Sequence, residues 1–329
     1  MTKARASGSD AVHLLAKETV YGTPISGAGG GVYRRMPLRS YSLGAEQPLE
    51  DDPVWNRSRP EDSDPAQGNL TVTGDIVLPM DARGVGMALL MALGPAVSAE
   101  TGVDTDVFEH VFLSGKDLLS FTHQIGHPKL STPKWRTHLG VKAGGMQFPM
   151  QRNGRALMTI PLIGQSEVKD ASGARDASPL IYDYLPFNNA SGSVKVEGAT
   201  VANITGGQFN FSNGLEPVET IRADMMIDGV DDGLRTLSGT VDLRFGADST
   251  FDDLADANTP AALQLAFTIP SQPDWSLTFN MPRVFFPKTK KPVQGPGGIS
   301  VTANWRAAFD QTAGHMLEVV LVNDVTSYA

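Results

Sequence analysis

The sequence repeats one pattern of motifs. Each copy holds a Ser-x-Gly-x-Glu block, then an acidic loop, then a strand-like run and a short helical run. These parts are residues 42–48, 69–78 and 81–93 in the first copy, and residues 212–217, 235–245 and 249–257 in the second. An internal repeat of this kind predicts two copies of one structural unit, and it favours a building block over a catalyst.

The strand-like runs alternate apolar and polar residues with period two, which is typical of half-buried strands. In each run a glycine, Gly74 or Gly239, lies in the middle of the apolar face. The other members of this face are Leu70, Val72, Ile76 and Leu78 in the first run and Leu237, Val241, Leu243 and Phe245 in the second. A mid-strand glycine often marks a bulge or a close approach of another backbone, so its recurrence favours two equivalent strands.

Helices and further strands follow in each copy. Asp81 can cap a first helix that ends before Gly94, while Phe251 and Leu254 form the apolar side of a shorter second helix. The further strands are expected at residues 107–113, 118–125, 141–150 and 156–163, matched with 262–269, 275–281, 284–287 and 299–309. This matching aligns Gly44 with Gly214 and Ser120 with Ser276.

Two polar segments divide the chain. Residues 1–31 are small and glycine-rich, which predicts an N-terminal arm and hinge outside the core. Residues 169–190 are polar and read as a linker. The two modules are then expected at residues 32–168 and 191–329.

Composition narrows the class of function. The 329 residues include no cysteine, which excludes disulfides, zinc–thiolate sites and cysteine nucleophiles. A net charge of −9 argues against a grip on nucleic acid, although an acidic surface lets DNA slide past without binding. No segment reads as a membrane span or a signal peptide, so we expect synthesis in the cytoplasm and no membrane partner.

No pattern of reactive side chains stands out. His123 and His127 are four residues apart, but a strand does not bring such a pair together, so surface histidines are expected rather than a metal site. His110, His138 and His315 are isolated in the sequence. We therefore expect no catalytic residue, no metal and no cofactor, in a protein that is not an enzyme.

The acidic loop of the first copy, residues 46–64, is longer than ordinary connections. Its prolines break the oxygen spacing of a calcium loop, which leaves a solvated loop and a loop that docks on another subunit as alternatives. Lys288, Lys290 and Lys291 form a small basic patch that suits the rim of a contact. The contact candidates in the acidic loop are Glu50, Asp51, Asp52, Trp55, Arg57, Arg59, Glu61 and Asp62.

Short motifs run in a fixed order through nearly the whole chain. They are Leu-Leu-Ala-Lys-Glu-Thr-Val-Tyr-Gly-Thr-Pro at 14–24, Ser-Leu-Gly-Ala-Glu-Gln-Pro at 42–48, Gly-Asn-Leu-Thr-Val-Thr-Gly at 68–74, Asn-Gly-Leu-Glu-Pro-Val at 213–218, Leu-Ser-Gly-Thr-Val-Asp-Leu at 237–243, Pro-Arg-Val-Phe at 282–285 and Gly-Pro-Gly-Gly at 295–298. In this order and spacing the chain resembles the major tail, or tail tube, proteins of bacteriophages with long, non-contractile tails (siphophages). The first copy departs from the family pattern because it lacks a clean Pro-Arg-Val element.

The resemblance implies a mainly β fold of two tandem tail-tube modules. Each module would be a β-sandwich or partial barrel with one flanking α-helix, and sheets of neighbouring subunits would join into a β-barrel, which leaves no sheet edge exposed. It further implies a structural virion protein that polymerises into stacked rings. The tube would assemble around the tape-measure protein in the host cytoplasm, end at tail terminator and distal tail proteins, and conduct DNA without binding it specifically.

The repeat adds a counting rule to the resemblance. If one copy fills one sixth of a ring, three duplicated chains close a pseudo-hexameric, homotrimeric ring. Contacts between rings or subunits are then expected in the acidic loop, in its counterpart with Glu216, Asp231 and Asp232, and in the arm with Tyr21. Asp75 and Asp242, on the polar faces of their strands, are candidates for the lumen.

Two other classes of protein remain as alternatives. One is the tube of a contractile injection system, whose proteins are usually shorter and hold a single copy. The other is a two-domain β-sandwich hydrolase or carbohydrate-binding protein, which would need an aromatic-lined cleft, whereas only 7% of the residues are aromatic.

Overall fold

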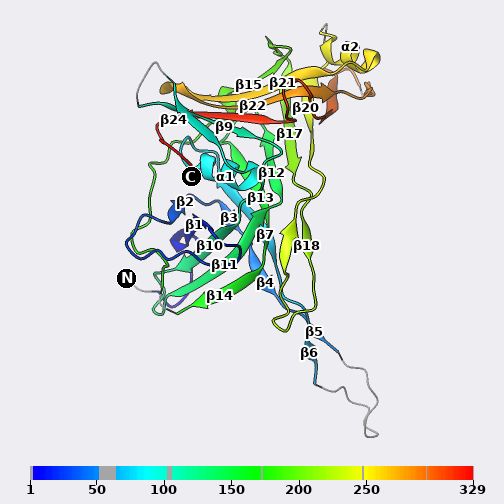
Figure 1. The fold of residues 1–329 in the computed structure, drawn as a ribbon. Helices are drawn as coiled ribbons and strands as arrows, with labels where there is room; N and C mark the ends of the chain where they lie inside the picture. Colours follow the sequence, from blue (N-terminus) through cyan, green and yellow to red (C-terminus); the bar gives the residue numbers. More distant parts are fainter. Residues whose placement is uncertain are drawn as a thin grey trace, which may run out of the picture.

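The computed structural model describes residues 3–51, 64–101, 106–171, 173–246, 248–293 and 295–328. Antiparallel strands make up most of this described part, together with two α-helices and two short 3-10 turns, η1 (Gly8–Asp10) and η2 (Asn189–Ser191) (Figure 1). The expected mainly β fold is confirmed.

One sheet, here called the central sheet, is built from both halves of the chain. Its hydrogen-bonded order is β4–β7–β13–β12–β17–β20–β23, and β3 extends the β4 edge along β7. The strands are β3 (Ser40–Tyr41), β4 (Gly44–Glu46), β7 (Thr71–Pro79), β12 (Gly145–Met150), β13 (Leu157–Gly164), β17 (Ile204–Ser212), β20 (Thr236–Arg244) and β23 (Ser300–Ala307). The join between the halves is the pairing of β12 with β17.

Period-two alternation gives the central sheet one buried and one polar face. The buried face carries Val72, Ile76 and Leu78 on β7 and Leu237, Val241 and Leu243 on β20, as the sequence predicts. Aromatic rings fill the core where the halves meet, with Phe148 stacked on Phe209 at 4.6 Å between ring centroids. Burial of such rings is among the largest apolar contributions to stability, at about 25 cal/mol per Å² removed from water.

Two outer sheets cover this buried face. The first has the order β2–β1–β10–β11–β14, with β1 (Val12–Lys17), β2 (Arg34–Met36), β10 (Phe121–His127), β11 (Lys134–Ala143) and β14 (Ser166–Asp170). The second has the order β16–β15–β21–β22–β24–β9–β8, with β8 (Val97–Glu100), β9 (Phe108–Leu113), β15 (Gly192–Val196), β16 (Ala199–Thr200), β21 (Ala261–Ile269), β22 (Gln272–Phe285) and β24 (Glu318–Asn323). Each half therefore has the layers of a β-sandwich.

The sheet order corrects how the two copies were matched. β10 lies between β1 and β11, as β21 lies between β15 and β22, so β10 is the counterpart of β21. The alignment of Ser120 with Ser276 is therefore wrong. β9 has no place in this repeat, because it pairs with β24 from the end of the chain.

The two helices differ in their surroundings. All residues of α1 (Val85–Leu93) are buried between the layers, whereas α2 (Thr250–Ala257) buries only Phe251 and flanks the second half. A helix that is apolar on every side is typical of a core position. The expectation that Asp81 caps this helix is wrong, because the N-cap residue is Gly84 and no side chain caps it. Asp81 instead accepts hydrogen bonds from the Arg83 and Gly84 amides at 3.1 and 2.8 Å, in the turn that precedes the helix. No helix in the described ranges is long and apolar enough to cross a membrane.

The first residues of the chain depart from the expectation of an arm outside the core. Residues 12–17 form β1, whose Leu14, Leu15 and Ala16 are almost fully buried and which pairs with β10. The segment 32–36 lies against the expected linker, since the Arg35 amide donates to the Leu180 carbonyl at 2.9 Å and the Leu180 amide donates to the Tyr33 carbonyl at 2.8 Å. Four consecutive residues of β1 are buried, so this strand lacks period-two alternation and the sequence pattern does not reveal it.

Candidate assembly interface

The mid-strand glycines lie where two backbones approach closely. A Cβ atom at Gly239 would lie 2.0 Å from the Gln208 carbonyl oxygen and 2.5 Å from a ring carbon of Trp305. At Gly74 it would lie 2.5 Å from the Ser42 carbonyl oxygen. The close approach predicted from the repeat is confirmed at both positions.

The central sheet has two outer edges. In the described part of the chain, β3 and β4 pair only with β7, and at the opposite edge β23 pairs with β20 and with the last residues of β22. An edge strand presents unpaired backbone groups and is a template for another strand. These edges are therefore candidates for contact with further copies of the chain.

The polar face of the central sheet is rich in hydroxyl and amide groups. These polar side chains include Glu46 on β4, Thr71, Thr73 and Asp75 on β7, Thr159 on β13, Gln147 on β12, Gln208 and Asn210 on β17, Ser238, Thr240, Asp242 and Arg244 on β20, and Ser300, Thr302, Asn304 and Arg306 on β23. Both lumen candidates lie here, Asp75 exposed and Asp242 half-buried, where it accepts a hydrogen bond from the Thr302 hydroxyl. Three of these groups are acidic and two are basic, so the face offers no net positive charge and is suited to a polyanion that moves past it.

Both acidic loops start and end in two-stranded ribbons. The first ribbon pairs β5 (Leu49–Glu50) with β6 (Ala66–Gln67), and the second pairs β18 (Glu216–Val218) with β19 (Gly229–Asp231). The β5–β6 ribbon projects from the end of the molecule opposite α2 (Figure 1). The candidates Glu50 and Asp51 are exposed on or next to it. The other loop candidates, Asp52, Trp55, Arg57, Arg59, Glu61 and Asp62, lie outside the described residues.

The second ribbon packs against the first half of the chain. The Met225 carbonyl accepts from the Leu70 amide at 2.9 Å, and the Val230 carbonyl accepts from the Lys142 ammonium at 3.0 Å. Glu216 lies directly opposite Asp231, a like-charge pair that costs stability and favours a basic partner. Asp232, by contrast, is already paired with Arg235 at 3.1 Å.

Tyr21 is the remaining contact candidate, and it is half-buried beside Gly140. Its hydroxyl is buried without a hydrogen-bond partner, and desolvation raises its pKa to about 12. An unpaired buried hydroxyl costs free energy, so this tyrosine is held by packing in the single chain.

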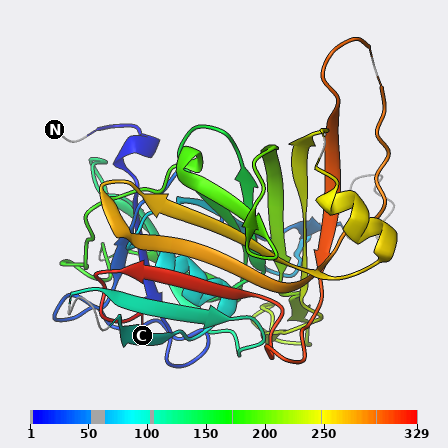
Figure 2. The ribbon, with the colours of Figure 1, turned by 90° about the horizontal axis from the view of Figure 1, so that it is seen from above.

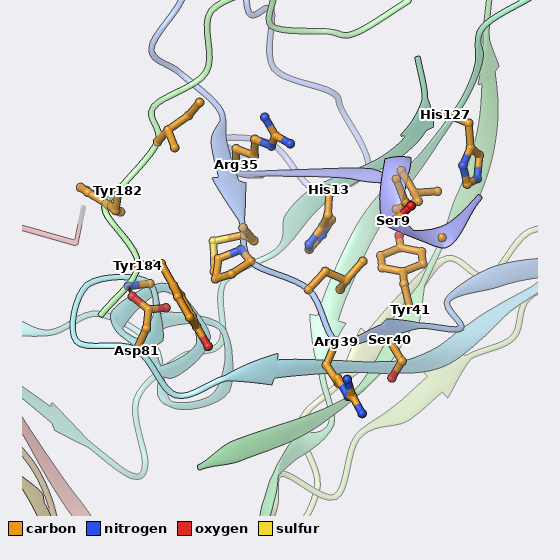
Figure 3. A pocket seen from close by; sticks show the side chains of 18 residues that line it. Ser9, His13, Arg35, Arg39, Ser40, Tyr41, Asp81, His127, Tyr182 and Tyr184 are labelled. Atoms are coloured by element: carbon orange, nitrogen blue, oxygen red, sulfur yellow. Dashed lines mark hydrogen bonds between the residues drawn. The ribbon is translucent and has the colours of Figure 1, made fainter. Parts of the chain in front are cut away.

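A cavity of about 520 Å³ opens beside the β3 edge (Figure 3). Its labelled lining includes Ser40 and Tyr41 from β3, His13 from β1, and Tyr182 and Tyr184 from the expected linker. A smaller cavity of about 290 Å³ lies in the matching place of the second half, where Val194 of β15 and Leu265 and Phe267 of β21 line it.

Buried histidines lie at the larger cavity, which corrects the expectation of a surface position for His123 and of an isolated His138. His127, which also lines the cavity, is half-buried. His13, His123 and His138 are each at most 1% exposed. The His13 Nε2 and His123 Nδ1 atoms are 3.1 Å apart, and the Tyr41 hydroxyl is 2.8 Å from His138 Nδ1. His110 is also buried, and its imidazole forms hydrogen bonds with the side chains of Ser98 and Asn323. Sequence spacing missed this because His13 is 110 residues from His123 in the chain, and only the pairing of β1 with β10 brings the two together.

Burial governs the charge of this cluster. Desolvation lowers the pKa of His13 to about 3 and that of His123 well below its ordinary value. For His138 desolvation also lowers the pKa, although Glu167, 3.1 Å away, acts in the opposite direction. The imidazoles are therefore neutral at pH 7. Within the residues that the structure describes, no group of three or more His, Cys, Asp or Glu side chains is placed to hold a metal ion.

A comparison with known protein families identifies the family of this chain. The sequence matches the family described as phage tail tube protein over residues 8–307, which includes both halves and both sheet edges. The chain belongs to the phage tail tube protein family. As a tail tube protein it is a structural component of the virion tail, where copies assemble into a tube with other tail components. No similar protein was found among curated sequences.

Proposed function

We propose that this tail tube protein forms homotrimeric, pseudo-hexameric rings that stack into the tube of a long, non-contractile tail. The observation that carries the proposal is the β12–β17 join, which places two matching parts of the central sheet side by side. Among the described strands, the outer side of β3 and β4 stays unpaired, and on the outer side of β23 only Arg306 and Ala307 pair, with the end of β22. Repetition of the same join between chains turns the sheet into a closed barrel, since heterologous contacts form rings when the rotation closes. The expected division into modules at 32–168 and 191–329 is part of this proposal.

The polar face of the central sheet would then line the lumen. Asp75 and Asp242 would face passing DNA, and together with Glu46 they would offset Arg244 and Arg306 on the same face, which leaves DNA no net cationic grip. During assembly the same lumen would enclose the tape-measure protein, and the completed tube would meet the tail terminator and distal tail proteins at its ends. The tube would serve as a conduit for DNA ejection.

The β5–β6 ribbon and its loop, the β18–β19 ribbon and the first residues of the chain would bridge neighbouring rings or subunits. The support is the projection of the first ribbon from the molecule and the unbalanced pair Glu216 and Asp231 on the second. The contact residues would be those named from the sequence, including Tyr21.

The test is the symmetry of the assembled tube. Electron microscopy of purified tubes should show rings of three chains with six similar lobes around the lumen. Rings of six chains would contradict the counting rule, and a protein that stays monomeric at every concentration would contradict the proposed tube.

A further inference from the structure

The registers of the two halves identify equivalent positions. Ile163 lies opposite Thr73 and Lys142, while Arg306 lies opposite Ser238 and Phe285. Thr73 and Ser238 are equivalent because each directly precedes one of the matching glycines. Their partners Ile163 and Arg306 are then equivalent, and so are the next partners across the sheet, Lys142 and Phe285. After Lys142 the chain enters β12, the strand that joins the halves.

The segment after Phe285 is the counterpart of β12 in the second half. Counting from the equivalent residues aligns Pro149 with Pro292, Gln147 with Lys290 and Met150 with Val293. Unlike β12, residues 288–293 form no strand and lie in the long connection from β22 to β23, which projects from the body (orange loop, Figure 2). Their place in the sheet, next to β23, has no partner strand among the described residues.

The β3–β4 edge is the counterpart of the edge that β12 joins. Gly44 is equivalent to Asn210, because Gly44 pairs with Thr73 and Asn210 pairs with the equivalent residue Ser238. Within the chain, β12 places Gln147 opposite Asn210. The same register between two chains would place Lys290 opposite Gly44. It would also place Lys288 opposite Glu46, which adds opposite charges to the pairing.

The two cavities support the same docking. Met150 and Arg152, from the end of β12, form a wall of the smaller cavity. The larger cavity lies in the equivalent place beside Tyr41 and has no wall of this kind. Val293, the counterpart of Met150, is 72% exposed in the single chain, and the shared register brings it opposite Tyr41.

We propose that residues 288–293 add as a strand to the β3–β4 edge, residues 40–46, of the next copy of this chain. This rests on the proposed tube and names the contact that links its subunits. In the single chain the segment is held beside α2, where Lys288 pairs with Asp256 at 2.8 Å and Lys291 with Asp252. Exposed ion pairs contribute little to stability, so they exchange readily for a strand pairing. The segment leaves α2 and becomes a strand as subunits join.

A disulfide across the proposed junction tests this register, because the chain contains no cysteine of its own. The variant carries Lys290→Cys and Gly44→Cys and is assembled, then oxidised mildly. Opposite residues of an antiparallel pair have Cα atoms about 4.5–5.5 Å apart, within reach of a disulfide. We expect most of the assembled protein to become covalent multimers, up to a closed ring, that reduction returns to monomer.

Two matched variants serve as controls. Gln147→Cys with Asn210→Cys places the pair at the equivalent internal junction and should form a disulfide within one chain. Lys290→Cys with Ser40→Cys displaces one partner along the strand by about 13 Å, too far for a disulfide, and should give no multimers.

The outcomes separate this proposal from the proposed tube. Tubes that form but give no covalent multimers, while the internal control crosslinks, would overturn the docking and leave the tube intact. Covalent multimers without rings or tubes would support the docking and overturn the tube. Neither assembly nor multimers would overturn both.

Discussion

At the scale of single residues, the matching glycines set how closely strands can pack. Gly239→Ala would place a methyl group against the Gln208 carbonyl and the Trp305 ring, so we expect it to lower the free energy of unfolding by about 1–3 kcal/mol. The matched control is Gly229→Ala, also in a strand, where nothing lies within 4 Å of the added atom. Urea denaturation measures both variants, and equal midpoints would contradict the close approach.

The buried histidines make stability depend on pH. The pKa of His13 is lower in the folded chain, about 3, than the ordinary 6.5, so the unfolded chain takes up its proton first as pH falls. Stability should therefore be complete above pH 6.5 and decline below it, by about 1.4 kcal/mol per pH unit for each such histidine. Urea titrations between pH 8 and 5 measure this decline.

A variant isolates the contribution of the cluster to that decline. His13→Gln keeps a hydrogen-bonding side chain but does not titrate, so its stability should fall less steeply below pH 6.5 than that of the unmodified protein. Equal slopes, or stability that rises on acidification, would contradict the neutral buried state of His13.

At the scale of elements, the β5–β6 ribbon is the part most separable from the core. Deleting residues 51–62 should leave a soluble, folded monomer, because Leu49, Glu50, Ala66 and Gln67 of the ribbon are all exposed. We expect this variant to form no tubes, since the loop is proposed to bridge rings. Circular dichroism checks the fold and negative-stain microscopy checks assembly.

A second deletion controls for loss of a surface loop in general. Removing residues 312–313, in the exposed turn between β23 and β24, should leave tube formation unchanged. Tubes formed by the 51–62 deletion at the normal rate would contradict the bridging role.

At the scale of the whole molecule, the two halves share one fold. β9 of the first half pairs with β24 of the second, and β12 pairs with β17. Residues 191–329 expressed alone would expose both strand edges and part of a continuous core, so we expect them to aggregate or stay unfolded. Co-expression with residues 1–190 should restore a soluble complex, measured by size-exclusion chromatography. A stable, monomeric second half would contradict this dependence.

The sequence alone was sufficient for the features that depend on neighbouring residues. Period-two alternation predicts β7 and β20 with their buried faces, and an apolar run that stops at Gly94 predicts α1. The recurrence of Gly74 and Gly239 predicts a doubled unit, because a close backbone contact that leaves no room for a side chain requires glycine in each copy of the unit. The resemblance to tail tube proteins also came from the sequence, through the order and spacing of its short motifs.

Only the tertiary structure decided which distant segments meet. Strand pairing depends on contacts across the chain. β9 pairs with β24 from the end of the chain, and β1 lies in a sheet although residues 1–31 were expected to form an arm outside the core. The histidine cluster arose in the same way, from β1, β10 and β11. The sequence predicted two modules, and only the structure shows that they join through the pairing of β12 with β17. The reason is that every residue type except proline offers the same backbone hydrogen-bonding groups, so the sequence does not specify which strand pairs with which.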